Sequence, residues 1–142
     1  MGPVAAPDPR EVIRQMFDAW NAGDVESMIG LYRPDAVFDA SDRIFNPDVY
    51  RGHEELRRFS SEVDRDWERW QVEMESVIEL DPERFLVLMR SQARGRASGI
   101  ELEEHNSAAI WTIREGLVVH AKLFSDRAEA FAAAGIPDPS AE

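Results

Sequence analysis

Three side chains of this sequence could carry out acid–base chemistry: Asp39, His105 and Tyr32. Asp39 ends the apolar segment DAVFDA, and a carboxylate turned into apolar surroundings has its pKa raised toward a range useful for a general base. A histidine can give or take a proton near neutral pH, and a tyrosine can donate a hydrogen bond to a ligand oxygen or a neighbouring carboxylate. We therefore interpret Asp39 as a base, His105 as an acid or base, and Tyr32 as an orienting donor.

Asp39 and His105 also have a purely structural interpretation. Asp39 could be a strand-end carboxylate that bonds to nearby backbone or to Arg43. Strict alternation along a strand turns it away from both of its neighbours. His105 could be a polar residue whose hydrogen bonds are satisfied by Glu103 or Ser107.

A group of large side chains at helical and strand spacing could line a pocket for a flat hydrophobic ligand. These residues are Trp20, Phe59, Trp67, Met89, Trp111, His120 and Phe124. Aromatic residues at such spacing are also typical of an ordinary core, and Tyr32 could equally be a core tyrosine with a local partner. The sequence leaves both interpretations open.

The charge and composition of the chain exclude several classes of protein. Asp and Glu number 28 against 16 Lys and Arg, and this net charge of −12 repels phosphate backbones and anionic membranes. We therefore expect no nucleic-acid partner and no membrane partner. The chain has no cysteine for a disulfide, a thiolate metal site or a thiol nucleophile, and its histidines lie too far apart to share a metal, so no metal and no cofactor are expected. The first residues lack signal-peptide features, and no apolar run approaches the roughly 20 residues of a membrane span, which predicts a soluble, cytoplasmic protein.

Hydrophobic periodicity predicts the elements that must position these side chains. Helices are expected from Asp8 to Gly23, over a short segment after Asp24, and over residues 53–70, because apolar residues recur there every three or four positions. Residues 41–52 contain many turn-forming residues and are predicted to be a loop.

The second half of the chain changes to the two-residue period of strands. A last helix stops at Gly135. Helices followed by a run of strands predict an α+β fold, with the helices on one face of a curved antiparallel sheet. We expect one domain over residues 1–142 with an ordered core of about 8–136, and strands at residues 71–80, 84–94, 99–114 and 117–124.

Short hairpin turns predict which residues of these strands lie opposite each other. A two-residue loop at Glu115–Gly116 pairs Trp111 with His120, and a turn centred near Ala97 pairs Met89 with His105. The turn after the strand at residues 71–80 pairs Ile78 with Val87 and Met74 with Ser91. Alternation then gathers on the face covered by helices Met74, Ile78, Val87, Met89, Ser91, His105, Ser107, Trp111, His120 and Phe124.

The opposite face of the sheet is predicted to carry a cross-strand row of Glu75, Arg90 and Glu104. An uncovered apolar patch on a sheet indicates a partner subunit, so we expect a homodimer through this outer face. The patch beside the charged row consists of Leu86, Leu88, Ile110, Val119 and Leu123.

Four stretches of the sequence resemble a known superfamily with the nuclear-transport-factor-two-like fold, which is a cystatin-like cone. They are FDAWNAGDVESMIGLYRPDAVFD, YRGHEELRRF, RGRASG and GLVVHAKLFSDRAEAFAAAG, and the resemblance runs from about Pro9 to Ile136. The chain is most similar to the SnoaL-like branch, which includes polyketide cyclases and relatives of ketosteroid isomerase. The resemblance implies a curved antiparallel sheet wrapped around N-terminal helices, with a mostly apolar central pocket.

Ketosteroid isomerases in this superfamily use an Asp at the end of the first strand as general base. A Tyr from the first helix and a protonated Asp from a late strand form their oxyanion hole. The resemblance places Ala40, Met16 and Ala109 at these three positions, so the isomerase catalytic residues are not matched. A supporting tyrosine of the family is matched by Tyr32.

SnoaL-like cyclases instead place an acid on a later strand, where this chain offers Glu103 or His105. The sequence therefore predicts a protein that binds a small hydrophobic molecule. If it is an enzyme, the expected chemistry is cofactor-free acid–base catalysis of the isomerase, cyclase, dehydratase or hydrolase type. The alternative is a non-catalytic ligand-binding or dimerisation module, because one fold hosts many functions.

Overall fold

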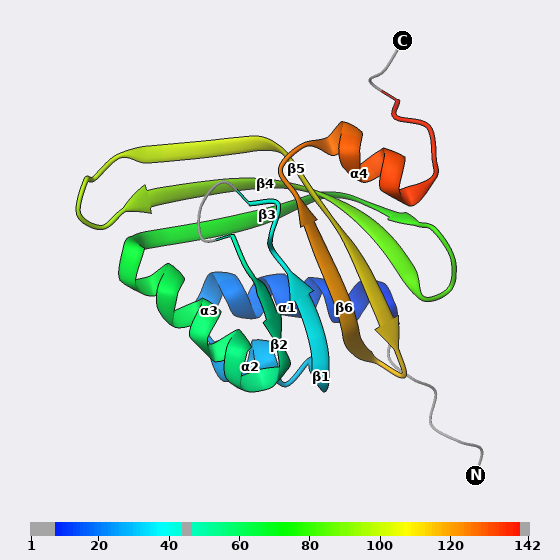
Figure 1. The fold of residues 1–142 in the computed structure, drawn as a ribbon, viewed down its shortest axis with the longest axis horizontal. Helices are drawn as coiled ribbons and strands as arrows, with labels where there is room; N and C mark the ends of the chain where they lie inside the picture. The colour runs from blue at the N-terminus through cyan, green and yellow to red at the C-terminus, as the bar shows by residue number, and fades with distance from the viewer. Residues whose placement is uncertain (1–7, 44–46, 140–142) are drawn as a thin grey trace.

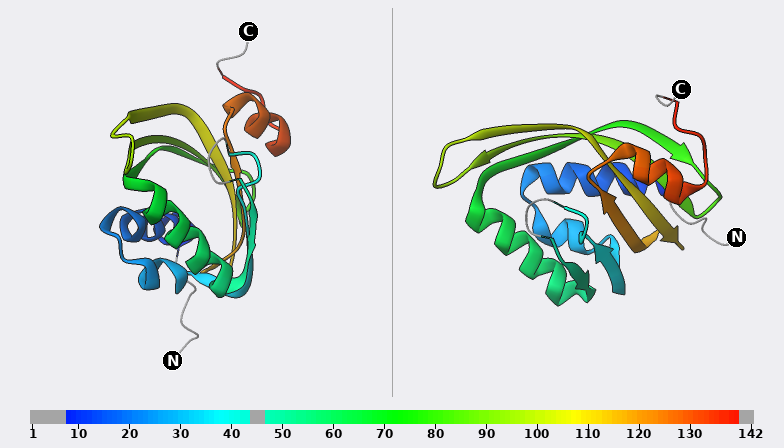
Figure 2. Two further views of the ribbon diagram at one scale, coloured as in Figure 1. Left: turned by 60° about the vertical axis from the view of Figure 1, so that its left-hand side comes forward. Right: turned by 45° about the horizontal axis from the view of Figure 1, so that its top comes forward.

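The computed structural model describes residues 8–43 and 47–139, and within them a strongly bent sheet packs against helices. Figure 1 shows α1, α2 and α3 together on one side of the sheet, and Figure 2 shows that the sheet curves around them while α4 lies on its convex side. The helices are α1 (Pro9–Ala22), α2 (Val25–Ile29), α3 (Gly52–Asp66) and α4 (Arg127–Ala134). The strands are β1 (Tyr32–Asp39), β2 (Val49–Arg51), β3 (Trp67–Glu79), β4 (Arg84–Gly95), β5 (Glu101–Arg114) and β6 (Leu117–Phe124).

The strands follow the order β2-β1-β6-β5-β4-β3 across the sheet. Strands β3 to β6 form an antiparallel meander, and β1 joins it by pairing in parallel with β6. The α+β cone predicted from the sequence is confirmed, with the curved sheet wrapped around the N-terminal helices. Strand β2 lies in the segment that was predicted to be a loop.

Helix α1 forms because both of its ends are capped and one of its faces is apolar. Asp8 accepts a hydrogen bond from the backbone of Arg10, and Pro9 occupies the first turn, where no backbone donor is required. Gly23 closes the helix with a φ of 73°, a left-handed conformation that a side chain would strain. The buried face carries Val12, Ile13, Met16 and Phe17.

The same helix covers the open edge of the sheet. Strand β3 is an edge strand, whose unpaired backbone groups would otherwise be free to pair with another chain. The side-chain amide of Asn21 donates to the Val72 carbonyl at 2.7 Å and accepts from the Val72 backbone N–H at 2.8 Å, and the Trp20 indole donates to the Trp70 carbonyl at 3.0 Å. Side chains of α1 thus take the place of a further strand.

The helix predicted over residues 53–70 ends earlier, at Asp66. Trp67 and Trp70 therefore belong to β3 rather than to this helix, and the two indoles pack edge to face with their centroids 4.9 Å apart. The chain passes directly from α3 into β3, and no glycine or proline marks the change in the sequence.

The predicted pairing of β5 with β6 is wrong by one residue over most of its length. The turn at Glu115–Gly116 has the predicted two residues, since Arg114 pairs with Leu117. A β-bulge between Thr112 and Ile113 then shifts the register, so that Trp111 faces Ala121 and His120 faces Thr112. A shift of one residue moves a side chain to the other face, so His120 lies on the convex side of the sheet rather than inside.

The predicted pairing of β4 with β5 is also wrong, by up to two residues. Met89 pairs with Ser107 and Ser91 pairs with Glu104, because a bulge sets two residues of β5 against one residue of β4. Alternation then places Glu104 on the concave side with Ser91, and His105 on the convex side. The sequence had predicted His105 on the concave side and Glu104 on the convex side.

Strands β3 and β4 show a similar shift. Val77 pairs with Val87, and Met74 pairs with Met89, so the predicted partners of Ile78 and Met74 are wrong. The register changes between Met74 and Ser76 and leaves Glu75 as the extra residue. The predicted row of Glu75, Arg90 and Glu104 is therefore not formed.

Arg127, the first residue of α4, bridges the strands where these bulges interrupt the ladder. Its guanidinium donates to the backbone oxygens of Met89 at 3.0 Å and Ser107 at 3.3 Å, and it forms an ion pair with Glu75. Its three partners belong to β4, β5 and β3, so one cation stabilises three neighbouring strands at the bend.

Helix α4 also covers most of the apolar patch that predicted a homodimer. Phe131 and Ala130 pack with Leu86 and Phe124 in one cluster, and Leu88 and Ile110 are half-buried against it. Leu123, assigned to the outer face by the sequence, packs instead against the inner core. The patch is thus largely covered by the chain's own C-terminal helix.

The contact between Asn21 and the edge of β3 leads to a testable prediction about stability. Asn21→Ala is expected to lower the free energy of unfolding by about 1–3 kcal/mol, because it removes both hydrogen bonds to Val72 and leaves half-buried backbone groups unpaired. Urea unfolding followed by circular dichroism measures this difference. Asn106→Ala is the matched control, since its amide makes a single exposed bond to Asp126, and a change within about 0.5 kcal/mol is expected. An equal loss of unfolding free energy in the two variants would contradict the conclusion that Asn21 of α1 covers the edge of β3.

Candidate functional site

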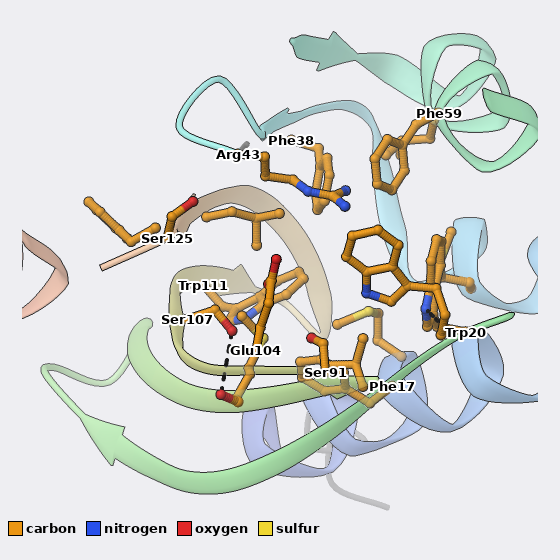
Figure 3. Close-up of a pocket in the computed structure, with 18 of the residues that line it drawn as sticks. Phe17, Trp20, Phe38, Arg43, Phe59, Ser91, Glu104, Ser107, Trp111 and Ser125 are labelled. Atoms are coloured by element: carbon orange, nitrogen blue, oxygen red, sulfur yellow. Dashed lines mark hydrogen bonds between the residues drawn. The ribbon is translucent and has the colours of Figure 1, made fainter. Parts of the chain in front are cut away.

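A cavity of about 90 Å³ lies between the concave face of the sheet and the helices. Its lining residues, most of them drawn in Figure 3, come from α1, α2 and α3 and from β1, β3, β4, β5 and β6. Most of the lining is aromatic or flexible apolar surface: Met16, Phe17, Trp20, Met28, Phe38, Leu56, Phe59, Trp70, Met89, Trp111 and Phe124. Such a surface suits a flat hydrophobic molecule.

The aromatic side chains form a continuous wall rather than isolated contacts. Phe59 stacks on Trp20 with the ring centroids 5.7 Å apart, and it lies 5.0 Å from Phe38. Tyr32 and Trp111 continue the wall, with 6.3 Å between their centroids. These distances are typical of stabilising ring pairs, so the wall is held in place by its own packing.

Two hydrogen-bond donors on this wall have no partner among the residues that the structure describes. The Trp111 indole N–H is buried and unpaired. The Tyr32 side chain is only 2% exposed, burial raises the pKa of its hydroxyl, and no bond to that hydroxyl is found within residues 8–43 and 47–139. An unmade hydrogen bond at a buried polar group lowers the free energy of unfolding by roughly 1–3 kcal/mol. Most buried polar groups in folded proteins have a partner, so unpaired donors on one cavity wall are uncommon.

Polar side chains enter the cavity from its other walls. The Ser107 hydroxyl is bonded to the Met89 carbonyl at 3.4 Å, whereas in the described part of the chain the buried Ser91 hydroxyl has no such bond. Figure 3 shows the Glu104 carboxylate and the Arg43 guanidinium directed into the same space, from β5 and from the loop after β1.

The Arg43 guanidinium rests on aromatic rings. Its central carbon lies 4.4 Å from the Trp70 centroid and 5.4 Å from the Phe59 centroid. Burial lowers the pKa of this guanidinium, while the negative charge of Glu104 acts in the opposite direction. The side chain stays cationic at physiological pH because an arginine in a protein does not lose its proton.

Asp39 lies outside the cavity lining. Its carboxylate accepts hydrogen bonds from the Ser41 backbone at 3.0 Å and the Ser41 hydroxyl at 2.6 Å, and it pairs with Lys122 at 3.3 Å. Burial alone would raise the pKa of Asp39, but the bonds from Ser41 and Lys122 outweigh it and hold the pKa below its usual value. The geometry is that of a strand-end carboxylate bonded to nearby backbone, with Lys122 rather than Arg43 as its cation.

The two histidines predicted to face inward also lie outside the cavity lining. His105 is exposed and lies 3.3 Å from Glu103, one of the partners foreseen in its structural interpretation. His120 is half-buried on the convex side, between Val37 of β1 and Thr112 of β5. Trp67 lines a separate open groove that it shares with Trp20 and Trp70. Within the described residues, no three His, Cys, Asp or Glu side chains group closely enough to hold a metal ion.

Six of the residues singled out from the sequence do meet in the cavity lining: Trp20, Tyr32, Phe59, Met89, Trp111 and Phe124. Sequence reasoning missed Glu104 and Arg43 as cavity residues. No signal in the sequence marks the bulge that turns Glu104 inward, and Arg43 belongs to a loop whose path is not periodic. The one hint was the acid that the resemblance places on a later strand, where the sequence offered Glu103 or His105, the two residues on either side of Glu104.

Fold and cavity together define a nuclear-transport-factor-two-like cone with an aromatic interior. Residues 13–121 match the SnoaL-like domain, and the chain belongs to the SnoaL-like family. No curated protein matches the sequence. Among the described residues, no helix combines the length and the apolar character needed to cross a membrane.

Solved structures share the fold at low sequence identity. A nuclear-transport-factor-two-like protein of Burkholderia pseudomallei is 19% identical, with 89% of this chain and 96% of that chain covered and a TM-score of 0.74. TerC, co-crystallised with polyporic acid, is 15% identical, with 91% and 99% covered and a TM-score of 0.73. A putative polyketide cyclase of Sinorhizobium meliloti is 19% identical, with 80% and 93% covered and a TM-score of 0.61. At these identities the likeness establishes the fold.

The bonding of Asp39 predicts a pH-dependent effect on stability. Asp39→Asn is expected to lower the free energy of unfolding at pH 7 by about 1 kcal/mol, because the charge-assisted bonds to Ser41 and Lys122 are weakened. The pKa of Asp39 is lower in the folded protein than in the unfolded chain, where it is about 3.9. Its carboxylate therefore stabilises the folded protein above about pH 3.9, and this stabilisation is lost as the pH falls through the pKa of the folded state. The difference between wild type and variant should therefore shrink below about pH 4.

Urea unfolding at a series of pH values from 7 to 3 measures this effect. Asp35→Asn is the control on the same strand, since Asp35 is exposed and pairs only with the exposed Arg33, and little change is expected at any pH. An Asp39→Asn difference that grows toward acid pH would show that the folded-state pKa is raised instead.

Proposed function

We propose that this protein binds a small, flat, hydrophobic molecule with a hydrogen-bond acceptor oxygen in the cavity of the cone. The observation that carries the proposal is the buried Trp111 indole N–H, which has no partner among the described residues, beside the Tyr32 hydroxyl, to which those residues offer no bond either. A ligand carbonyl oxygen placed against them would recover the bonds that the protein leaves unmade. The gain would be larger than at the surface, since water does not compete in a buried site.

The size of the cavity limits this ligand. Typical small-molecule sites enclose roughly 300–1,000 Å³, which is well above the 90 Å³ found between the rings here. The ligand is therefore compact, or it enters as flexible side chains move aside. Met16, Met28 and Met89 line the cavity and supply that adaptability, because a methionine side chain is unbranched and changes shape easily.

Relatives support a flat oxygen-bearing ligand. TerC was crystallised with polyporic acid, and the Sinorhizobium protein is described as a putative polyketide cyclase. Their sequences are too distant to transfer a substrate to this chain, and they support the proposal only as proteins of the same fold.

We further propose that Glu104 is the acid–base group of the site. A carboxylate facing a bound ketone can remove a proton from the carbon next to the carbonyl, and the electron pair of the broken C–H bond moves to the carbonyl oxygen. Tyr32 and Trp111 would stabilise the resulting enolate as an oxyanion hole. Return of the proton to another carbon gives an isomerisation, while attack of the enolate on a second carbonyl gives an aldol cyclisation. The base role assigned to Asp39 and His105 from the sequence thus passes to Glu104.

The second candidate function is ligand binding without catalysis. It is favoured by the residues at the three ketosteroid isomerase positions, Ala40, Met16 and Ala109, all of which are buried and have no acid–base capacity. The two candidates differ in whether Glu104 affects a bound ligand chemically, and the experiments below separate them.

Binding is tested with a matched pair of probes: 2-tetralone, a bicyclic ketone, and tetralin, the same skeleton without the oxygen. Wild type is expected to bind 2-tetralone at least about tenfold more tightly, because a buried hydrogen bond discriminates by 1 kcal/mol or more. Tyr32→Phe should remove much of this preference while leaving the affinity for tetralin and the melting temperature unchanged or higher. Trp111→Phe should also reduce the preference, but it is expected to lower the melting temperature, because the smaller ring leaves a void in the core. Isothermal titration calorimetry gives the affinities, and equal binding of both probes would overturn the donor assignment.

Catalysis is tested by exchange of the protons next to the 2-tetralone carbonyl for deuterium, followed by proton NMR in D₂O. Wild type should accelerate the exchange, and Glu104→Gln should reduce the enzymatic rate by about 10²-fold or more, the usual contribution of a positioned base. Glu101→Gln is the control, since Glu101 is exposed on the same strand. Asp39→Asn and His105→Ala test the earlier assignment in the same assay. Binding of 2-tetralone without accelerated exchange would support the non-catalytic alternative.

Homodimerisation and a cytoplasmic location stay predictions of the sequence. The convex face next to α4 still carries half-buried residues, among them His120, Thr112 and Val119, on which a second copy would have to pack. Sedimentation of the purified protein at micromolar concentration decides its oligomeric state.

A further inference from the structure

Arg43 differs from most other arginines of this protein in what its charge contacts. In the described part of the chain, eleven arginines form ion pairs with carboxylates, as an acidic chain of net charge −12 readily allows. Arg10, Arg51 and Arg69 do not, and all three are exposed to water. Arg43 is half-buried, and the described residues offer its guanidinium two ring faces and no hydrogen bond or ion pair.

The chemistry of a guanidinium makes this arrangement incomplete. The group carries five N–H donors in one plane, and a cation that has lost much of its water is stable only if those donors are bonded. The faces of Trp70 and Phe59 hold the charge but accept no hydrogen bond in its plane. Glu104 faces the same space without forming an ion pair with Arg43. The N–H edge of the guanidinium therefore has no acceptor among the described residues and is available to a ligand in the cavity.

We propose that Arg43 pairs with a carboxylate of the ligand, so that the molecule bound in the cavity is a compact aromatic acid. This inference rests on the proposed function of the same cavity and adds the charge of its ligand. A carboxylate matches the planar fork of a guanidinium through two parallel bonds, which gives both affinity and orientation. The aromatic body of the acid would lie along Phe59, Phe38 and Trp111, with any second oxygen toward Tyr32.

A cationic or neutral ligand fits these observations less well. Arg43 already occupies the faces of Trp70 and Phe59, which are the surfaces that would hold an organic cation, and it would repel one. A neutral ligand could offer the guanidinium one carbonyl oxygen, but neither the charge nor the pair of oxygens that matches its planar fork. The overall charge of −12 disfavours any anion at long range, so a preference for an acid would have to arise inside the cavity itself.

The test compares three probes of one size: 2-naphthoate, the neutral 2-naphthamide, and the cation 2-naphthylmethylammonium. Isothermal titration calorimetry of the full-length protein should show 2-naphthoate binding at least about tenfold more tightly than the amide, as expected for a charge-assisted bidentate contact. Arg43→Gln should abolish this preference and leave the affinity for the amide within about threefold. Arg43→Lys, which keeps the charge but loses the planar fork, should retain only part of it. The control Arg65→Gln removes the same charge from an exposed position on α3 and should change nothing.

The outcomes separate this inference from the proposed function. Equal affinity for acid and amide in wild type, tighter binding of the cation, or an Arg43→Gln variant that keeps the preference would overturn the role of Arg43. In those cases binding of 2-tetralone would leave the proposed function standing. Failure of all three naphthyl probes together with 2-tetralone would overturn both. Circular dichroism melting curves of the Arg43 variants verify that each is folded before its affinities are interpreted.

Discussion

The interruption of the strand ladder across β3, β4 and β5 is the constraint on which the rest of the structure depends. Extra residues at Glu75 and at His105–Asn106 fall on β3 and β5, the two strands that flank β4, and a bulge bends its strand and increases the local twist. Arg127 donates to two of the backbone oxygens at this bend and pairs with Glu75. The bend lets the sheet close around the helices, and the shift of register behind it turns Glu104 inward. The same feature therefore shapes the cavity and supplies its carboxylate.

The cavity keeps polar groups in places where an ordinary core would have none. Its walls are aromatic and tightly paired, yet the Trp111 indole N–H is buried there without a partner among the described residues, and Arg43 and Glu104 bring opposite charges without meeting in an ion pair. Each of these groups destabilises the folded protein unless it finds a partner, and proteins keep such groups chiefly at functional sites. Their convergence on one space, rather than any single residue, is what distinguishes this cavity from the groove beside Trp67.

Much of the fold could be predicted because local patterns are repeated over many residues. The apolar face of α1, the capping residues at its ends and the turn at Glu115–Gly116 are each specified within a few positions of the chain. The register of the sheet could not be predicted in this way. Hairpin turns were found where they were expected, but bulges several residues beyond each turn changed the facing partners, so His105 and His120 lie outside and Glu104 lies inside. A bulge leaves no compositional mark, whereas a turn requires particular residues.

The sequence by itself determined the α+β class, the order of helices and strands, the family, and the aromatic residues that make the cavity wall. These properties depend on composition and on periodicity, which are local. Tertiary structure alone decided which ionisable groups share the cavity, and that α4 packs on the apolar patch of Leu86, Leu88 and Ile110. The reason is that the face occupied by a strand residue changes with every single-residue shift in pairing, and that pairing is fixed by contacts such as those of Arg127, which lie far away along the chain.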